Sequence, residues 1–413
     1  MNITVDCSAV SGTLAAIPSK SDAHRALICA ALSDTPCFIR LSSSSADIDA
    51  TAACMSALGA HINRTENGFE ITPINKKLDC TLDCGESGST LRFLMPVAAA
   101  LGGKTSFIGH GRLPARPIDM ICEMLESHGC TVSDTHLPAT VSGKLCGGTF
   151  RLAGNISSQH ISGLLMALPL CGGSEIILQT PLESAGYVDM TLRTMARFGV
   201  AARKTDTGFI CDAGTYKAPS VYEVEGDWSN AAFPLALAAI GGSVTMTGLL
   251  QDSAQGDKAI LDVLSSFGAS VSCDGTAVTV KKGALHCIEL DMSDIPDMLP
   301  AAAALAAAAD GETRFYNAGR LRIKESDRLS AMYSVLTALG ADVTELDDGL
   351  IVRGGKQLYG AVVNGFNDHR IVMTACILSK LCASPITIEG KEAVNKSYPS
   401  FFEDFERIGG KII

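Results

Sequence analysis

A helix that ends in glycine recurs six times along this chain, at intervals of about 70 residues. The glycines are Gly59, Gly129, Gly199, Gly268, Gly340 and Gly409. Each follows an apolar segment and precedes a β-rich one, which is typical of a helix C-terminus where glycine adopts a positive φ without a steric penalty. A fixed period of this length indicates a repeat architecture, because each repeat is one supersecondary unit.

A polar loop that opens an apolar helix lies about 40 residues before each of these glycines. The six loops cover residues 19–25, 85–92, 157–160, 227–230, 294–297 and 367–370. A turn and a short strand separate the two helices of each unit, most clearly at 103–108 and 242–247. The unit is therefore predicted as helix, strand, helix and a strand pair. Six such units predict an α/β fold of two lobes with three units each.

Two lobes of three units would divide the chain near its middle. We expect lobe one over residues 14–225, and lobe two over residues 1–13 and 226–413, with a leftover N-terminal strand at 2–8 joining lobe two. The chain would then cross between the lobes twice. Two crossings permit hinge closure around a ligand, so the ligand is expected in the cleft between the lobes.

The charge balance excludes several classes of partner. The formal net charge is -11 and the pI is about 5.2, so no general basic face is expected for nucleic acid or anionic lipid. Apolar runs such as 299–309 are too short to span a bilayer, and residues 1–7 resemble neither a secretory nor a transit leader. The fifteen cysteines lack paired CxxC spacing, which favours free thiols in a reducing compartment. We predict a cytoplasmic monomer without nucleic-acid or membrane partners.

Basic side chains gather instead at the predicted helix starts, where free N–H groups and the helix dipole favour anions. First-helix starts contribute Lys20, Ser21, Arg25, Ser89, Arg92, Ser157, Ser158, Gln159, Asp297, His369 and Arg370. Second-helix starts contribute Arg116, Tyr187, Lys324, Glu325, Arg328 and Lys396. So many cations predict a ligand with several negative charges, and the two acids among them, Asp297 and Glu325, are candidates for proton transfer. No metalloprotease, Walker A or dinucleotide motif stands in the right context, so metal, ATP and NAD roles lack support.

Each of these residues also has a simpler interpretation. The charged stretch 320–328 is typical of a solvated helix face. Ser157 and Ser158 could cap a helix, and Asp297 could do the same beside Pro296. A non-catalytic scaffold that closes on an anion is therefore a second hypothesis. The loss of an acid among retained cations would favour the scaffold, whereas here both acids are present.

Nine short motifs lie in order along the chain. They are Pro18-Ser19-Lys20-Ser21 with Arg25, Gly88-Ser89-Thr90-Leu91-Arg92, Ala115-Arg116-Pro117, Ser157-Ser158-Gln159, Glu225-Gly226-Asp227, Asp294-Ile295-Pro296-Asp297, Lys324-Glu325-Ser326-Asp327-Arg328, Asn367-Asp368-His369-Arg370 and Asn395-Lys396-Ser397-Tyr398-Pro399. Together they resemble the enolpyruvyl transferases, and among these the enzymes that act on shikimate 3-phosphate.

The resemblance implies both a fold and a reaction. The fold would be two lobes, each of three βαβαββ units, in an inside-out α/β barrel. The reaction would transfer the enolpyruvyl group of phosphoenolpyruvate to the 5-hydroxyl of shikimate 3-phosphate and release phosphate, as a step of aromatic amino-acid biosynthesis. The resemblance implies no metal or organic cofactor.

The resemblance also assigns roles to residues. Shikimate 3-phosphate would be bound by Lys20, Ser21, Arg25, Ser157, Ser158, Gln159, Ser184, Tyr187, Asp297 and Lys324. Phosphoenolpyruvate would be bound by Lys20, Gly88, Arg92, Arg116, Gln159, Arg328, Arg370 and Lys396. Asp297 would take the proton of the 5-hydroxyl and Glu325 would protonate the methylene carbon, with Lys20 and Lys324 as further catalytic groups. The family binds glyphosate near Gly88, so Gly88→Ala is predicted to exclude that inhibitor more than the substrate.

Several positions depart from the family pattern. Ser19 follows Pro18 directly, where a glycine often intervenes, and Ala23-His24 stands where Ser-Asn is common. Three more departures are Glu86 and Arg320, where Asn is usual, and Phe93, where Pro is usual. They lie on the phosphoenolpyruvate side, so they bear on substrate affinity and inhibitor sensitivity. The alternative function is that of the sister enzyme acting on UDP-N-acetylglucosamine, which typically carries a cysteine where this chain has Gly111. This difference and the triplet at 157–159 favour shikimate 3-phosphate as the acceptor.

Overall fold

Every strand of the computed structural model, which describes residues 1–413, belongs to one of six four-stranded sheets. In each sheet a first strand runs parallel to its neighbour, and the two remaining pairs are antiparallel. Six sheets of one pattern confirm the predicted repeat. The chain forms two compact units, which we call lobe one (Pro18–Val224) and lobe two (Met1–Ile17 with Glu225–Ile413).

Lobe one holds three repeats. The first contains α1 (Lys20–Ala31), β3 (Cys37–Arg40), α2 (Ala46–Ala57), β4 (His61–Thr65) and β5 (Gly68–Thr72), with β14 (Val221–Glu223) as the parallel strand. The second contains β6 (Cys80–Asp83), α3 (Gly88–Leu101), β7 (Lys104–Ile108), η1 (Leu113–Ala115), α4 (Asp119–Glu126), β8 (Cys130–Val132) and β9 (Ala139–Gly143). The third contains β10 (Thr149–Leu152), α5 (Ser158–Ala167), η2 (Leu168–Cys171), β11 (Ser174–Leu178), α6 (Ala185–Arg197), β12 (Ala202–Thr205) and β13 (Gly208–Cys211).

Lobe two repeats the pattern. Its first repeat contains β2 (Val10–Ala15), α7 (Trp228–Gly241), β15 (Gly242–Thr247), η3 (Gly256–Ala259), α8 (Ile260–Ser266), β16 (Ser270–Asp274) and β17 (Ala277–Lys281). Its second contains β18 (Glu289–Asp291), η4 (Pro296–Met298), α9 (Leu299–Ala308), β19 (Glu312–Tyr316), η5 (Gly319–Ile323), α10 (Arg328–Ala338), β20 (Asp342–Leu346) and β21 (Gly349–Arg353). Its third contains β22 (Val362–Asn364), α11 (His369–Leu378), η6 (Ser379–Leu381), β23 (Ile386–Glu389), η7 (Lys391–Lys396), α12 (Phe401–Arg407) and β24 (Gly410–Ile412), completed by β1 (Asn2–Cys7).

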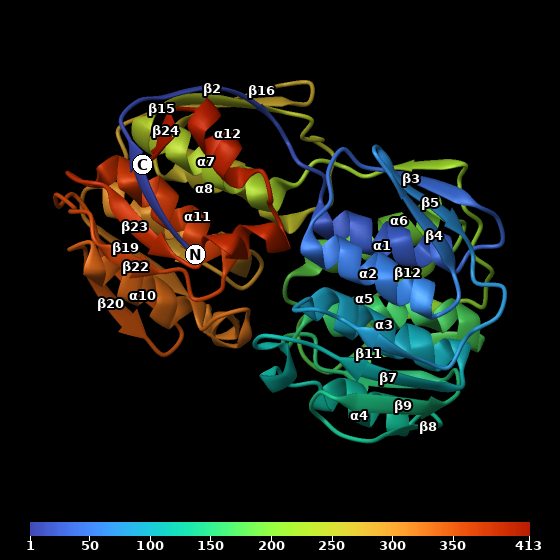
Figure 1. Ribbon diagram of the computed structural model, residues 1–413. Helices are drawn as coiled ribbons and strands as arrows, with labels where there is room; N and C mark the ends of the chain where they lie inside the picture. The colour runs from blue at the N-terminus through green and yellow to red at the C-terminus, as the bar shows by residue number, and fades with distance from the viewer. The chain divides into compact units, whose positions relative to one another are not determined.

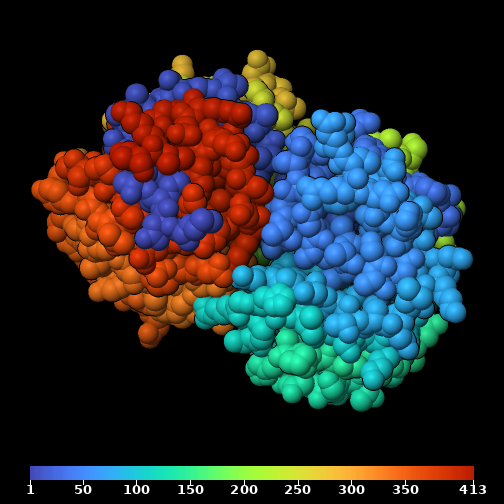
Figure 2. All heavy atoms as spheres, in the orientation of Figure 1, coloured from blue at the N-terminus to red at the C-terminus, as the bar shows by residue number.

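The first lobe boundary lies between Ile17 and Pro18 rather than between residues 13 and 14. The reason is β2, which is parallel to β15 along its whole length and therefore belongs to lobe two. The second boundary lies between Val224 and Glu225, one residue before the expected position. Figure 2 shows the consequence for the surface of lobe two, where the first residues of the chain (blue) lie among the last ones (red).

The six glycines that mark the repeat all have positive φ values, between 75° and 117°. Five of them directly follow the C-cap residue of α2, α6, α8, α10 or α12. The exception is Gly129, because α4 ends early, with Ser127 as its C-cap. The prediction of a glycine in a left-handed conformation after the second helix of each repeat is therefore confirmed.

The first helix of each repeat forms the interior of its lobe. In lobe one, α1, α3 and α5 lie between the strands of different sheets (Figure 1), and every residue of α1 from Asp22 to Ala31 is buried. α3 and α5 approach closely at Gly163, where an added Cβ would lie 2.5 Å from the carbonyl oxygen of Arg92. This packing brings the N-terminal ends of the inner helices together. None of the helices is long and apolar enough to cross a membrane.

Candidate active site

The first turn of α1 holds Lys20 against a second helix. Ser19 caps α1 by accepting a hydrogen bond from the backbone N–H of Asp22. Lys20 begins the helix, and its Nζ lies 2.8 Å from Oδ2 of Asp47 in the first turn of α2. Both side chains are mostly buried, so the ion pair fixes the ammonium group at the end of α1. Asp47 was missed by the sequence analysis, because an acid in a first turn is usually explained by the helix dipole.

Arg25 is buried among neutral oxygens. It is 2% exposed, and it donates hydrogen bonds to Thr191 Oγ1 (2.7 Å), Ser21 O (2.5 Å), Tyr187 O (2.8 Å) and Ser162 Oγ (3.4 Å). No carboxylate lies within ion-pair distance of this guanidinium, and burial lowers its pKa to about 10. The negative charge of Asp22 opposes this lowering of the pKa, so the guanidinium is charged at neutral pH. A buried cation without an ion-paired carboxylate suits a site for an anionic ligand. Of the predicted residues, Ser21, Arg25 and Tyr187 are thus brought together.

Two further arginines converge on the start of α3. An added Cβ at Gly88 would lie 2.6 Å from Nη1 of Arg116 and 2.7 Å from Nη1 of Arg92, so only glycine lets both guanidinium groups come this close. Gln159, in the first turn of α5, donates to Ser89 Oγ (2.9 Å) and accepts from Arg92 Nη1 (3.4 Å). The structure therefore gathers these predicted phosphoenolpyruvate residues around one helix start, where backbone N–H groups already favour an anion.

Three further serines predicted to bind shikimate 3-phosphate lie at two other helix starts. Ser157 caps α5 by accepting from the backbone N–H of Gln159, and Ser158 is buried in the first turn. Ser184 precedes α6 with a φ of 53°, a left-handed conformation that non-glycine residues seldom adopt. Strained residues of this kind are concentrated at functional sites, which supports a special role for Ser184.

In lobe two, Arg328 lies among three carboxylates. It is 1% exposed, and it donates to Asp297 Oδ1 (2.6 Å), Glu325 Oε2 (2.7 Å) and Asp368 Oδ2 (2.8 Å). Both predicted proton-transfer acids therefore share one guanidinium. Burial alone would lower the pKa of Arg328, but the charges of Asp368, Glu325 and Asp297 raise it above its usual value.

Asp297 is surrounded by positive charge. Besides Arg328, Lys324 Nζ lies 3.3 Å from its Oδ1, and Arg370 Nη2 lies 3.5 Å from its Oδ2. Burial would raise the pKa of this carboxyl, but Lys324, Arg370 and Arg328 hold the pKa well below its usual value. Asp297 is therefore ionised at neutral pH and can accept a proton, as a general base must.

Asp368 is a further residue of this cluster that the sequence analysis did not identify. It caps α11 by accepting from the backbone N–H of Arg370 (3.0 Å), and it also accepts from Ser326 Oγ (3.0 Å) and Arg328 Nε. Asp368 belongs to the motif at 367–370, which the sequence analysis did point out. However, the position of Asp368 just before α11 is fully explained by capping, which hides the ion pair.

Lys396 closes the third repeat of lobe two. Its Nζ donates to the carbonyl oxygen of Asn367 (2.6 Å).

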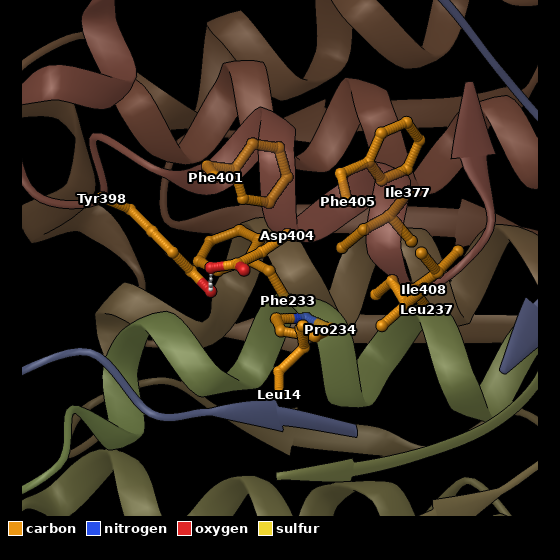
Figure 3. Close-up of a pocket in the computed structure, with 10 residues that line it drawn as sticks. All are labelled: Leu14, Phe233, Pro234, Leu237, Ile377, Tyr398, Phe401, Asp404, Phe405 and Ile408. Carbon is orange, nitrogen blue, oxygen red and sulfur yellow. Dashed lines mark hydrogen bonds between the residues drawn. The ribbon is translucent and has the colours of Figure 1, made fainter. Parts of the chain in front are cut away.

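A small cavity lies beside Tyr398, whose hydroxyl donates to Asp404 Oδ2 (3.0 Å), as Figure 3 shows. Tyr398 and Asp404, with mainly apolar neighbours, line this cavity of about 10 Å³, which has room for about one water molecule and none for a substrate. The cavity therefore lies outside the candidate site.

Three of the departures from the family pattern have different environments. Phe93 packs beneath Arg25, whose Cζ is 4.9 Å from the ring centroid. The carboxylate of Glu86 faces Gly111, where a Cβ would clash with it. Arg320 donates through Nη2 to the carbonyl oxygen of Ser293. No group of three or more His, Cys, Asp or Glu side chains is placed to hold a metal ion.

Comparison with known proteins gives matches along the whole chain. The 3-phosphoshikimate 1-carboxyvinyltransferase of Clostridium novyi is 43% identical over 100% of this chain and 98% of its own length. The corresponding protein of Clostridioides difficile is 42% identical over 98% of this chain and 97% of its own length.

Solved structures share the fold. EPSP synthase from Acinetobacter baumannii gives a TM-score of 0.84 with 23% identity, covering 100% of both chains. The enolpyruvyl transferase NikO from Streptomyces tendae gives 0.80 with 16% identity, covering 100% of this chain and 98% of its own. These likenesses confirm the predicted two-lobed α/β fold. Because the family model "EPSP synthase (3-phosphoshikimate 1-carboxyvinyltransferase)" also matches residues 6–405, the predicted enolpyruvyl transferase is confirmed, and this chain belongs to the EPSP synthase family.

Proposed function

We propose that this protein transfers the enolpyruvyl group of phosphoenolpyruvate to the 5-hydroxyl of shikimate 3-phosphate, by addition and elimination through a tetrahedral intermediate. The observation that carries the proposal is the placement of Asp297 and Glu325 on one buried guanidinium, in a chain that belongs to the EPSP synthase family. The family match does not favour the UDP-N-acetylglucosamine alternative. A scaffold would need neither acid, so their shared partner also argues against that hypothesis.

The acids of lobe two would move the protons. Asp297 is ionised and would accept the proton of the 5-hydroxyl group. The oxygen of that hydroxyl group would at the same time attack the substituted carbon of phosphoenolpyruvate. Glu325 would supply a proton to the methylene carbon in the same addition, and Lys324 would stabilise the negative charge nearby. Elimination of phosphate with loss of a methyl proton then restores the double bond.

The cations would bind the two anionic substrates. For shikimate 3-phosphate we propose Lys20, Ser21, Arg25, Ser157, Ser158, Gln159, Ser184, Tyr187, Asp297 and Lys324. For phosphoenolpyruvate we propose Lys20, Gly88, Arg92, Arg116, Gln159, Arg328, Arg370 and Lys396. The support for lobe one is the pair of arginines held at Gly88 and the buried Arg25 without an ion-paired carboxylate. Arginine suits planar carboxylate and phosphate groups because its donors form a rigid fork.

The decisive experiment measures phosphate release from phosphoenolpyruvate with either acceptor. We expect release with shikimate 3-phosphate and none with UDP-N-acetylglucosamine. Glu325→Gln should abolish release, whereas Glu312→Gln, which alters an exposed carboxylate paired with Arg353, should leave it unchanged. Release with UDP-N-acetylglucosamine alone, or with neither acceptor, would overturn the proposal.

The protein is also proposed to act as a monomer in the cytoplasm. All fifteen cysteines are free thiols, which fits a reducing compartment. Light scattering of the purified chain should give a mass near 43.0 kDa. A mass of twice that value would contradict the monomer.

A further inference from the structure

Four buried side chains form one chain of hydrogen bonds through the inner part of lobe one. His24 Nδ1 lies 2.6 Å from Thr51 Oγ1, and Thr51 Oγ1 lies 2.6 Å from Thr90 Oγ1. Thr90 Oγ1 donates to Ser87 Oγ at 2.8 Å. His24, Thr51 and Thr90 are 0% exposed and Ser87 is 1% exposed. The chain therefore links α1 and α2 to the residue that caps α3, out of contact with solvent.

The donors along this chain can be assigned in order. Ser87 Oγ accepts from both the backbone N–H and the hydroxyl of Thr90. The single hydroxyl proton of Thr90 is thus used, so Thr51 must donate to Thr90. The single proton of Thr51 is then used as well, so His24 must donate from Nδ1. His24 is accordingly the Nδ1–H tautomer, and its buried Nε2 has no hydrogen-bond partner.

His24 also stays neutral. Burial lowers its pKa well below the usual value, and the positive charges of Lys20 and Arg25 lower it further. The edge-to-face contact with Phe93, at 6.3 Å between ring centroids, fits an uncharged ring in an apolar pocket. A neutral ring that donates in one direction only is suited to fixing geometry rather than to moving protons.

The same two helices are joined at a second point. Lys20 and Asp47 form an ion pair one helical turn before His24 and Thr51, so α1 and α2 share two polar contacts on facing sides. Thr90 and Ser87 then extend the connection to Gly88, where Arg92 and Arg116 converge. The position of the Gly88 turn relative to Lys20 is therefore set through buried polar contacts.

We propose that His24 is a positioning residue for the phosphoenolpyruvate subsite, which acts through Thr51 and Thr90 on the turn at Ser87 and Gly88. The inference rests on the proposed function, because it presumes that Gly88, Arg92 and Lys20 bind phosphoenolpyruvate. Shikimate 3-phosphate would depend on it less, since Arg25 is held from α5 and α6 by Ser162, Tyr187 and Thr191. A small displacement of bound reactants lowers reactivity sharply, which makes such positioning consequential.

The test compares three variants in steady-state kinetics. His24→Leu removes the donor, and Thr51→Val removes the next link with little change of shape. Both should raise the KM for phosphoenolpyruvate about tenfold and the KM for shikimate 3-phosphate by less than about threefold. His24→Asn should stay within about threefold of wild type, because its amide nitrogen occupies the place of Nδ1 and can donate to Thr51.

A matched control separates positioning from loss of stability. Thr313→Val removes an equally buried hydroxyl, one that accepts from the backbone N–H of Ile288 in lobe two, and should leave both KM values unchanged. Variants that merely unfold in part would lose kcat with both KM values intact. If His24→Leu does not fold, Thr51→Val decides the kinetic question.

A second measurement does not depend on turnover. Nitrogen-15 NMR of wild-type protein labelled at histidine can be assigned to His24 by the ring signal that disappears in His24→Leu or His24→Asn. We expect that signal to show a proton on Nδ1 and none on Nε2 from pH 6 to 8. The opposite tautomer, or an unchanged phosphoenolpyruvate KM in Thr51→Val, would overturn the inference. An inactive wild type would instead refute the proposed function, while the NMR result would still test the hydrogen-bond chain.

Discussion

Arg25 in lobe one and Arg328 in lobe two are both almost fully buried, but their hydrogen-bond partners differ in charge. Arg25 donates to neutral oxygens of Ser21, Ser162, Tyr187 and Thr191, whereas Arg328 donates to three carboxylates. Burial lowers the pKa of Arg25 to about 10, while the carboxylates raise that of Arg328. The surroundings, and not burial itself, decide what a buried guanidinium does.

The difference separates two ways of using one side chain. A cation held by neutral groups keeps its charge available, so an incoming anion completes its environment. A cation held by acids, such as Arg328, instead brings several carboxyl groups close together around one guanidinium. Lobe one therefore holds a buried guanidinium among neutral oxygens, and lobe two holds one that three carboxylates share.

Arg328→Met should have the largest effect of the variants that test this difference. Three buried or partly buried carboxylates would lose their shared partner, and we expect the free energy of unfolding to fall by about 3–5 kcal/mol with loss of activity. Urea unfolding measures the change. Arg353→Met is the control, because this half-exposed arginine pairs with Glu312 and Asp342 at the surface and should cost less than about 1 kcal/mol. Equal losses in the two variants would contradict the role assigned to Arg328.

Asp297→Asn tests whether Asp297 acts as a general base. The amide keeps the shape of the side chain but cannot accept a proton, so kcat should fall by about 10²–10⁴-fold. The KM for phosphoenolpyruvate should change much less. Single-turnover rates with both substrates measure the chemical step directly. A rise in KM with unchanged kcat would mean that Asp297 binds substrate without acting as the base.

Arg25→Met tests whether the buried arginine of lobe one contributes to ligand affinity rather than to stability. Removal of a buried charge without a paired carboxylate should change the free energy of unfolding by less than about 2 kcal/mol. The dissociation constant of shikimate 3-phosphate should nevertheless rise by about 10–100-fold, because a charge-assisted contact is lost. Calorimetric titration measures the affinity. A large loss of stability with unchanged affinity would make Arg25 a structural residue and not a ligand-binding one.

Acid should weaken lobe two before lobe one. The pKa values of Asp297 and Asp368 lie below their usual value of 3.8, so both carboxyls stabilise the fold fully above that pH and lose their contribution as the pH falls through the folded-state values. We expect a loss of about 1–2 kcal/mol between pH 5 and pH 3. Hydrogen exchange should show α10 and α11 opening before α1 and α3. The reverse order would contradict the comparison.

The repeat and its phase could be predicted from the sequence, because a glycine after each helix is a local requirement of backbone geometry. The positions of Lys20, Arg25, Arg92 and Arg328 at or near helix starts followed from the same phase. What could not be predicted are the strands that complete a sheet from the far end of its lobe. β14 spans only Val221–Glu223 and carries no alternation that points to β3.

Side-chain contacts between helices could not be predicted from the sequence either. Asp368 binds Arg328 forty positions earlier, and nothing in the spacing distinguishes that ion pair from capping. His24, Thr51 and Thr90 come from three helices, and each alone is an ordinary buried residue. Such networks depend on how neighbouring helices are rotated about their axes, which hydrophobic periodicity fixes only coarsely.

The N-terminal strands of lobe two have a consequence for synthesis on the ribosome. β1 (Asn2–Cys7) is made before all of lobe one, whereas its two neighbours, β23 (Ile386–Glu389) and β24 (Gly410–Ile412), are made after it. Lobe one is one continuous segment and can acquire its full set of contacts while the rest is still being made. The nascent chain therefore carries β1 without its partner strands while the whole of lobe one is made, and β1 can pair only once β23 and then β24 have followed.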